Sequence, residues 1–531
     1  MNKRIFFNHL FGALFFIVLF GYFATSLTSI IMNYQTLGVG GIILNAFVLL
    51  FELLGPVYAT YLMIQLFDGI MEIGKISYDV TGIKNYPKVA VIIPIHNVNQ
   101  KLLDETLDGC KKITYPNLEV WVGDDCSEKK YVVECERLVQ KYGFNFHKGE
   151  VRSFKAGIIN QITPKLDAKY IAIFDADQIP VSDIITKFVA ILEQHPEYSF
   201  VQGKYESRNI SNLLHIWEAL SSFQLFCSQG GKRRIKTVIF HGTSACLRKE
   251  ISYPLPENHL SEDYEHLLRI TMQGHYGYFL NEVASLGLVT ESIDHKISQL
   301  YRWTTGQVSA FRNNLLKFFK SKMTFRKFLD YFISSTFVFL LTAFYFMGLF
   351  YSLMYWLKID IVRGLELSQM TPGFSDLLMV FMPMVVGIVY FIAFIAVGIY
   401  SRNTKAFRMK AWHLAFFIIY GGLLAPFLLI PTFKGMFGRN KVVPEKTKWN
   451  KKIRLNLIAS IFTIVGFIFA ALGIISLLDS IGIINWYGVN YFYPLFFVMA
   501  ITLIMALPFV IISKKAFKST KYFVDEASQY F

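Results

Sequence analysis

The apolar residues of this chain are gathered in long runs near its two ends, and this distribution limits the possible folds more than any other feature. The runs cover 5–33, 37–67, 331–357, 376–400, 411–432, 454–479 and 490–513. Each can supply the roughly 20 helical residues that cross the hydrocarbon core of a bilayer. Charged residues make up only 17% of the sequence, against about 25% in soluble domains. This excludes an ordinary soluble enzyme, a disordered scaffold and a disulfide-stapled secreted module.

The basic residues show which side of a membrane each segment faces. Lys+Arg exceed Asp+Glu by 53 to 38, a net charge of +15, and basic loops stay on the cytoplasmic side. The basic N-terminus predicts two transmembrane helices within 1–67 and a cytosolic domain after them. The excess is therefore read as a membrane signal, and no nucleic-acid partner is expected. The five cysteines all lie in that domain without a C-x-x-C pair, which indicates reduced thiols.

Two basic clusters, 401–410 and 433–454, flank the apolar run 411–432. Because a spanning helix would place one cluster outside, we expect 411–432 to be an interfacial or re-entrant helix. The region 331–531 then contains four spans and a basic, gating-like loop at 433–454, with a cytoplasmic C-terminus. The alternative is seven spans in all, with the C-terminus outside.

The segment between the membrane regions alternates strand-like and helix-like patterns, which is typical of an α/β domain with a mostly parallel sheet. Strand-like runs lie at Lys88–Ile95, Leu118–Val122 and Tyr170–Phe174. In such sheets ligands gather beyond the carboxyl ends of the strands. Neither a Walker lysine loop nor G-x-G-x-x-G follows the first strand, which argues against ATPases and dinucleotide enzymes.

Acidic pairs stand where two of these strands end. Asp124 and Asp125 follow the second strand, and Asp175 and Asp177 follow the third. A D-x-D pair suits a hard cation such as Mg²⁺ or Mn²⁺, which prefers oxygen ligands. A lone D-x-D is a weak signal, because acidic turns are common.

Further motifs follow in order. The set comprises D-D-x-S (124–127), K-A-G-x-x-N (155–160), D-A-D-x-x-P (175–180), S-E-D (261–263) and Q-x-x-R-W (299–303). A segment at 304–330 alternates apolar and basic residues, as an amphipathic helix on a membrane face does. Together these motifs resemble, over about residues 88–310, the processive membrane β-glycosyltransferases of family 2, which include cellulose, hyaluronan, chitin and poly-N-acetylglucosamine synthases.

The resemblance implies a cytosolic GT-A (Rossmann-like) domain over 68–303 within an α-helical transmembrane bundle. It implies roles for the motif residues, with Asp263 as the general base. The implied nucleotide-sugar ligands are Asp124, Asp125, Lys155, Asp175 and Arg302. The implied acceptor ligands are Trp303, Gln299, Gly242, Thr243 and Glu262. Asp177 with Asp175 would bind Mg²⁺ or Mn²⁺. Trp303 can equally be read as an interfacial belt residue.

The sequence also departs from the family pattern. Ser261 replaces the threonine of T-E-D. The stretch Val443-Pro444-Glu445-Lys446 has proline where the gating loop of cellulose synthases has threonine. This weakens the expectation of a loop that closes over the nucleotide.

The expected activity is that of an inverting, metal-dependent hexosyltransferase. It would polymerise a nucleotide sugar, expected to be UDP-linked, into a β-linked polysaccharide and export it through its own channel. The expected location is the plasma membrane, with several spans and a cytoplasmic catalytic domain. One alternative is a non-processive transferase with a lipid acceptor, of the ceramide or polyprenyl-phosphate type. A transporter or pseudoenzyme scaffold is the alternative from another class.

Overall fold

The computed structural model describes most of the chain except one long segment and several short ones. The described residues are 3–72, 78–83, 85–125, 127–149, 153–210, 212–257, 259–290, 292–359, 420–438, 455–485 and 493–516. The apolar run 376–400, the basic cluster 401–410 and the gating-like motif Val443–Lys446 lie outside them.

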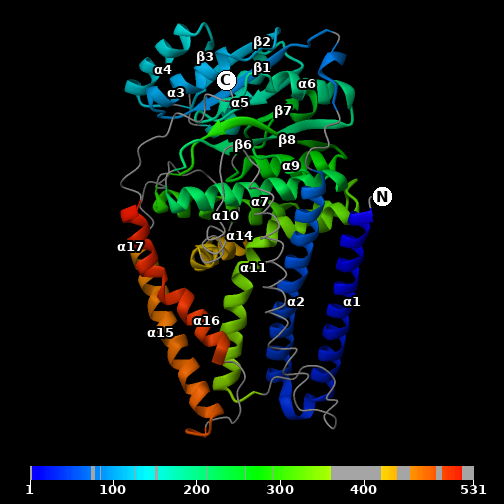
Figure 1. The fold of residues 1–531 in the computed structure, drawn as a ribbon, viewed down its shortest axis with the longest axis vertical. Coiled ribbons are helices and arrows are strands. Elements are labelled where there is room, and N and C mark those ends of the chain that lie inside the picture. Colours follow the sequence, from blue (N-terminus) through cyan, green and yellow to red (C-terminus); the bar gives the residue numbers. More distant parts are fainter. Residues whose placement is uncertain are drawn as a thin grey trace.

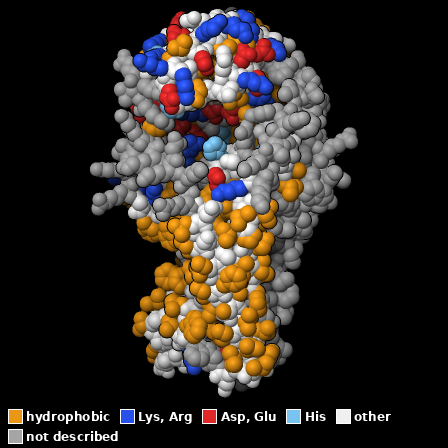
Figure 2. All heavy atoms as spheres, turned by 90° about the vertical axis from the view of Figure 1, so that its left-hand side faces the viewer, with side chains coloured by type: hydrophobic (Ala, Val, Ile, Leu, Met, Phe, Trp, Pro, Cys, Tyr) orange, Lys and Arg blue, Asp and Glu red, His pale blue; other side chains and the backbone are white. Residues whose placement is uncertain are grey.

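Long apolar helices extend from one side of the central domain (Figure 1). They are α1 (Lys3–Met32), α2 (Tyr34–Glu72), α11 (Phe325–Trp356), α15 (Leu455–Ser480), α16 (Tyr493–Ile504) and α17 (Ala506–Ala516). In the described part of the chain, four segments are long and apolar enough to cross a membrane: Phe15–Met32, Tyr34–Leu54, Leu455–Asp479 and Phe496–Lys514. Figure 2 shows apolar side chains over this part and charged side chains over the domain above it.

The central domain is built on an eight-stranded sheet in the order β3-β2-β1-β4-β7-β6-β8-β5. The strands are β1 (Val89–Ile95), β2 (Leu118–Asp124), β3 (Asn145–Lys148), β4 (Tyr170–Ile173), β5 (Ile179–Pro180), β6 (Tyr198–Ser207), β7 (Ala245–Arg248) and β8 (Tyr276–Gly287). The first four in the sheet order are parallel, whereas β7 runs antiparallel to both β4 and β6. The sheet is therefore mixed, and β2 and β4 end at the same edge.

Helices cover both faces of this sheet because its central strand is apolar on both sides. Val89, Val91 and Ile93 of β1 belong to one core cluster, and Ala90 and Ile92 belong to the other. The first cluster includes residues of α3 (Gln100–Lys111), α4 (Lys129–Lys141) and α6 (Ile184–Gln194). The second includes residues of α5 (Phe154–Ile162), α9 (Glu262–Met272) and α10 (Ile293–Phe318). The expected α/β class and GT-A-like arrangement are confirmed.

The remaining elements are short turns and the helices between the domain and the membrane helices. They are η1 (Val80–Gly82), η2 (Thr163–Lys165), α7 (Leu213–Ile235), α8 (Lys249–Ser252), η3 (Ala425–Leu428) and α14 (Leu429–Phe437). Of these, α7 and α14 lie with α10 between the sheet and the long apolar helices (Figure 1). The described part of the expected interfacial helix 411–432 is residues 420–432, which include η3 and the start of α14.

The helix expected over 304–330 has different bounds. Helix α10 begins at Ile293 and ends at Phe318, and α11 begins at Phe325. The earlier start follows from Ser292, whose hydroxyl accepts a hydrogen bond from the His295 amide and so caps the helix. The Q-x-x-R-W residues therefore lie inside α10 rather than before it.

A buried ion pair joins the domain to the membrane helices. The Lys232 ammonium on α7 lies 2.6 Å from a carboxylate oxygen of Asp330 on α11. The side chains are 6% and 0% exposed, and Tyr61 of α2 donates a hydrogen bond to the same carboxylate. Because each charge is compensated, this polar contact can be buried where three helices meet.

Candidate active site

The acidic pair at the end of β2 is buried and holds local backbone in place. One Asp124 carboxylate oxygen accepts a hydrogen bond from the Ser127 amide at 3.1 Å. The Asp125 carboxylate accepts one from the Ser153 amide at 2.7 Å, directly before α5. The pair thus links the β2 end to the helix that carries Lys155. Its role as a nucleotide ligand remains a prediction.

Lys155 connects its own motif, K-A-G-x-x-N, to the D-A-D-x-x-P motif. Its ammonium forms an ion pair with the Asp175 carboxylate beyond β4. Burial lowers the pKa of Lys155, but the carboxylates of Asp175, Glu262 and Asp263 outweigh it, so the pKa lies above its ordinary value. Lys155 is therefore a positive charge among three motif carboxylates.

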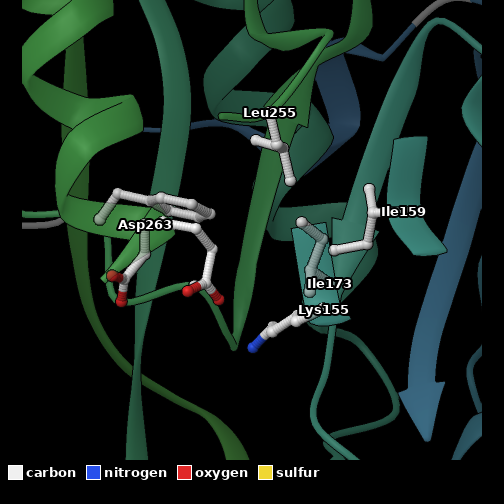
Figure 3. A pocket seen from close by; sticks show the side chains of 8 residues that line it. Lys155, Ile159, Ile173, Leu255 and Asp263 are labelled. Atoms are coloured by element: carbon white, nitrogen blue, oxygen red, sulfur yellow. The ribbon is translucent and has the colours of Figure 1, made fainter. Parts of the chain in front are cut away.

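Glu262 and Asp263 are the first two residues of α9 and lie across from Lys155. With Lys155 and Gly242 they line a small pocket whose other lining residues, Ile159, Ile173, Phe240 and Leu255, are apolar. Figure 3 shows the Lys155 ammonium and the Asp263 carboxylate directed into it. A Cβ atom at Gly242 would lie 3.3 Å from an Asp263 oxygen and 3.5 Å from the Lys155 nitrogen. Gly242 also has φ +74°, so glycine suits this position both sterically and conformationally.

Burial shifts the acid–base behaviour of both α9 acids. The pKa of Glu262 is raised to about 7 by burial and by the adjacent Asp263 charge, against the opposing effects of Lys155 and Arg302. Burial likewise raises the pKa of Asp263, and Lys155 and Arg302 oppose the shift. A pair of carboxyl groups with raised pKa values is suited to accept a proton near neutral pH.

Asp177 has the environment expected of a cation ligand. Burial and the neighbouring Asp175 charge raise its pKa to about 6, and no salt bridge to it occurs within the described residues. An added cation would relieve this repulsion. Within the part of the chain that the structure describes, no three or more His, Cys, Asp or Glu side chains cluster so as to hold a metal by themselves. The two aspartates therefore fit a cation that completes its shell with ligand oxygens and water.

The loop after His241 is fixed by a residue that the sequence did not single out. The buried Gln202 side chain accepts a hydrogen bond from the His241 amide and donates one to the Thr243 carbonyl, each at 2.9 Å. The Thr243 hydroxyl in turn accepts a hydrogen bond from the Asp175 amide at 2.9 Å. Thr243 thus lies beside the D-A-D motif, and its expected acceptor role remains a prediction. Gln202 lies in a strand and has no local sequence signal.

Helix α10 brings Arg302 of Q-x-x-R-W close to the same site. A Cβ atom at Gly306 would lie 2.1 Å from the Ser261 hydroxyl, so α10 packs directly against the start of α9. Arg302 lies close enough to lower the pKa values of Glu262 and Asp263. Trp303 is 39% exposed, and the Gln299 side chain accepts a hydrogen bond from Lys296.

Asn160, the last residue of K-A-G-x-x-N, fixes another wall of the pocket. Its amide exchanges hydrogen bonds of 2.8 Å with the Leu255 backbone N–H and C=O and donates one of 2.7 Å to Glu257. Leu255 lines the pocket. The motif asparagine therefore shapes the site from a neighbouring loop.

Comparison with known proteins agrees with this arrangement. Residues 87–306 match the family model described as "Glycosyltransferase like family 2". The chain is 26% identical over 248 residues to a UDP-forming cellulose synthase catalytic subunit of Pseudomonas fluorescens, covering 44% of this chain and 32% of that protein. It is 24% identical over 258 residues to a probable glucomannan 4-beta-mannosyltransferase of Arabidopsis thaliana, covering 45% and 48%. The alignments thus span less than half the length of either relative.

Among solved structures, the chain is similar to mannosyltransferase PcManGT from Pyrobaculum calidifontis in complex with GDP-Man and Mn²⁺. The TM-score is 0.49 at 15% identity, and the likeness covers 75% of this chain and 99% of that one.

Proposed function

Residues 87–306 form a glycosyltransferase domain of family 2, and from this premise we propose that the protein is a processive, inverting hexosyltransferase. It extends a β-linked polysaccharide from a nucleotide sugar and exports it through its own membrane helices. The observation that carries this proposal is the convergence of Lys155, Glu262 and Asp263 on one pocket. Lys155 also pairs with Asp175 of the D-A-D motif, and α10 packs against the acidic side of the pocket.

Asp263 is the general base of the proposed reaction. It takes the proton from the acceptor hydroxyl as that oxygen attacks the anomeric carbon of the donor sugar. The bond from this carbon to the diphosphate breaks, and the nucleoside diphosphate leaves with the electron pair. A single displacement inverts the anomeric centre and needs only one base.

The positive groups of the site would handle the leaving diphosphate. Lys155 and Arg302 bind its oxygens, and a guanidinium is well suited to phosphate. Asp175 and Asp177 would hold Mg²⁺ or Mn²⁺, which when bound supplies charge neutralisation for the leaving group. Asp124 and Asp125 fix the strand end at which the nucleotide binds. The relatives named UDP-forming support a UDP-linked donor.

The acceptor would lie along α10, between the pocket and the membrane helices. Trp303 offers an exposed aromatic ring for stacking on a sugar, one turn after Gln299 on α10. Glu262 and the Gly242–Thr243 loop would contact the acceptor from the side of the pocket. A polysaccharide carries many hydroxyl groups, and each one left unsatisfied in lipid costs several kcal/mol. A path between helices of the same chain removes that cost. We therefore propose a multi-pass plasma-membrane location with the catalytic domain in the cytoplasm.

The deciding experiment uses purified protein in lipid nanodiscs with Mg²⁺ or Mn²⁺ and a panel of radiolabelled nucleotide sugars. The proposal expects one donor to give a high-mass product that a β-specific glycosidase digests. A product consisting of one sugar on a lipid would instead establish the ceramide- or polyprenyl-type activity. Absence of transfer from every donor, with nucleotide binding retained, would identify a scaffold or transporter.

A further inference from the structure

A buried lysine lies directly behind the acceptor-side tryptophan. Lys296, in the first turn of α10, is 6% exposed. Its ammonium lies 5.3 Å from the centre of the Trp303 ring and 5.6 Å from that of Trp217 on α7. Both distances are within the range of a cation–π interaction, which strengthens when the cation is desolvated.

The same ammonium has two further partners. It lies 3.3 Å from a carboxylate oxygen of Glu218, which is also buried. It donates a hydrogen bond of 3.1 Å to the Gln299 side-chain oxygen. Burial lowers the pKa of Lys296, and the Glu218 charge opposes the shift. A buried charge with this many partners holds its neighbours in a defined geometry.

Glu218 fixes the start of α10 as well. Its carboxylate accepts hydrogen bonds from the hydroxyl and the backbone N–H of Thr290, shortly before the helix begins. Trp217, next to it, packs against Tyr420 at 5.4 Å between ring centres, and Tyr420 packs against Phe509 of α17 at 4.7 Å. The cluster therefore lies where the catalytic domain meets the membrane helices.

The spacing explains why one lysine contacts both motif residues. Lys296, Gln299 and Trp303 are separated by three and four residues, so they lie on one face of α10. Arg302 lies three residues after Gln299 and acts on Glu262 and Asp263. Gln299 therefore lies between the Trp303 side of the helix and the arginine.

We propose that Lys296, held by Glu218, is a positioning residue that fixes the Trp303 ring and the Gln299 amide for the acceptor sugar. The ammonium covers one face of the indole and leaves the opposite face for a sugar ring. This inference rests on the proposed function and adds to it an acceptor subsite of defined orientation. Lys296 itself touches no reacting atom.

The test compares Lys296→Met with a matched buried lysine. Lys232→Met removes the ammonium of the Lys232–Asp330 pair, which is equally buried but lies about 20 Å further along α7 than Glu218, from the helical rise of 1.5 Å per residue. Each variant is assayed in nanodiscs for sugar transferred to the growing glycan and for donor hydrolysed to free sugar.

For Lys296→Met we expect the ratio of transfer to hydrolysis to fall about tenfold through a raised acceptor KM, with hydrolysis preserved. Trp303→Ala should produce the same loss, and Lys296→Arg should restore most of the ratio, because a guanidinium also binds an aromatic face. Lys232→Met should lower the melting temperature and leave the ratio unchanged. An unchanged ratio in Lys296→Met, or an equal fall in Lys232→Met, would overturn the proposal.

A second measurement does not depend on turnover. In protein labelled with 5-fluorotryptophan, the Trp303 resonance is assigned by its loss in Trp303→Phe. Lys296→Met should shift this resonance and Lys232→Met should not. If the wild type transfers no sugar, the proposed function fails while this spectrum still decides whether Lys296 holds Trp303. An unmoved resonance refutes the positioning role.

Discussion

The carboxyl groups of the site differ because their immediate neighbours differ. Asp175 forms an ion pair with Lys155, whereas Asp177, half-buried beside it, has a pKa raised to about 6 by burial and by the Asp175 charge. Glu262 and Asp263 share one pocket wall and both have raised pKa values. Acid–base roles in enzymes are commonly set by such differences in environment. One pair is thus suited to hold a cation and the other to accept a proton.

Asp263→Asn should abolish sugar transfer, because an amide cannot take the proton from the attacking hydroxyl of the acceptor. Loss of a general base is expected to lower kcat about 10²–10⁴-fold. Nucleotide affinity, measured by isothermal titration calorimetry, should stay close to that of the wild type. The matched control is Glu265→Gln, two residues further along α9, where the carboxylate accepts hydrogen bonds from Asn314 and does not line the pocket. Retained turnover in Asp263→Asn would remove this residue as the base.

The raised pKa of Asp177 predicts a defined pH dependence of cation binding. The cation needs the ionised carboxylate, so Mn²⁺ affinity should fall about tenfold per pH unit below about 6. Electron paramagnetic resonance of free Mn²⁺ between pH 5 and 8 measures this. In Asp177→Asn the dependence through this window should disappear together with most of the affinity. A flat wild-type profile would contradict the assignment.

The same shift has a consequence for stability. The folded protein keeps the Asp177 proton to a higher pH than the unfolded chain does. Ionisation of Asp177 therefore lowers the free energy of unfolding as pH rises from about 4 to about 6. Asp177→Asn should therefore raise the melting temperature of cation-free protein more at pH 7.5 than at pH 5. Differential scanning fluorimetry at both values checks the sign.

At the scale of elements, α10 determines how the domain and membrane parts are joined. It packs on the sheet through Ala310 and Phe311, on α9 through Gly306, and on α14, where Thr305 donates to the Pro431 carbonyl. A change in its distance from α9 therefore alters the acidic wall of the pocket.

Gly306→Ala tests this contact. The new methyl group would overlap the Ser261 hydroxyl, and overpacking of this kind costs about 1–3 kcal/mol. We expect a lower melting temperature and a reduced kcat. The control is Gly21→Ala in α1, where a Cβ would meet no described heavy atom within 4 Å. Equal activity of the two variants would show that the α9–α10 spacing does not matter.

The sequence predicted those parts of the fold and site that depend on local pattern. The apolar run of β1 and the acids after β2 and β4 are contiguous signals, and parallel strands bring their carboxyl ends together. The antiparallel β7, the contacts of Gln202, and those of Lys296 with Trp217 and Glu218 depend on residues distant in sequence, which no local pattern encodes. The α10 start was missed although the cap Ser292 is visible in the sequence. The Lys296–Gln299 contact could have been predicted once the helix was known, because Lys296 lies three residues before Gln299.

For the whole molecule, buried and half-buried polar contacts hold the catalytic domain against the membrane helices. Besides Lys232–Asp330, Arg234 of α7 lies 2.8 Å from the Asp68 carboxylate of α2, which also contacts His9 of α1 at 2.9 Å. The domain is therefore attached through α7 to the N-terminal helices and through α10 to the C-terminal part.

A reporter at the C-terminus tests the arrangement of spans. With six spans and 411–432 at the interface, a fused alkaline phosphatase should be inactive and a fused fluorescent protein bright in intact cells. This follows because basic segments remain on the cytoplasmic side. Active phosphatase outside the cell would establish seven spans and require 411–432 to cross the membrane.

The position of α10 determines how far this protein can be divided into exchangeable modules. The family match ends at residue 306, in the middle of a helix that runs from Ile293 to Phe318. A chimera cut at the family boundary would join two half-helices from different proteins and separate Trp303 from the packing of Phe311. A donor domain grafted onto this membrane scaffold must therefore bring α7 and all of α10 with it. We therefore expect Trp303 and the membrane-side contacts of α10 to be exchanged together in any functional chimera.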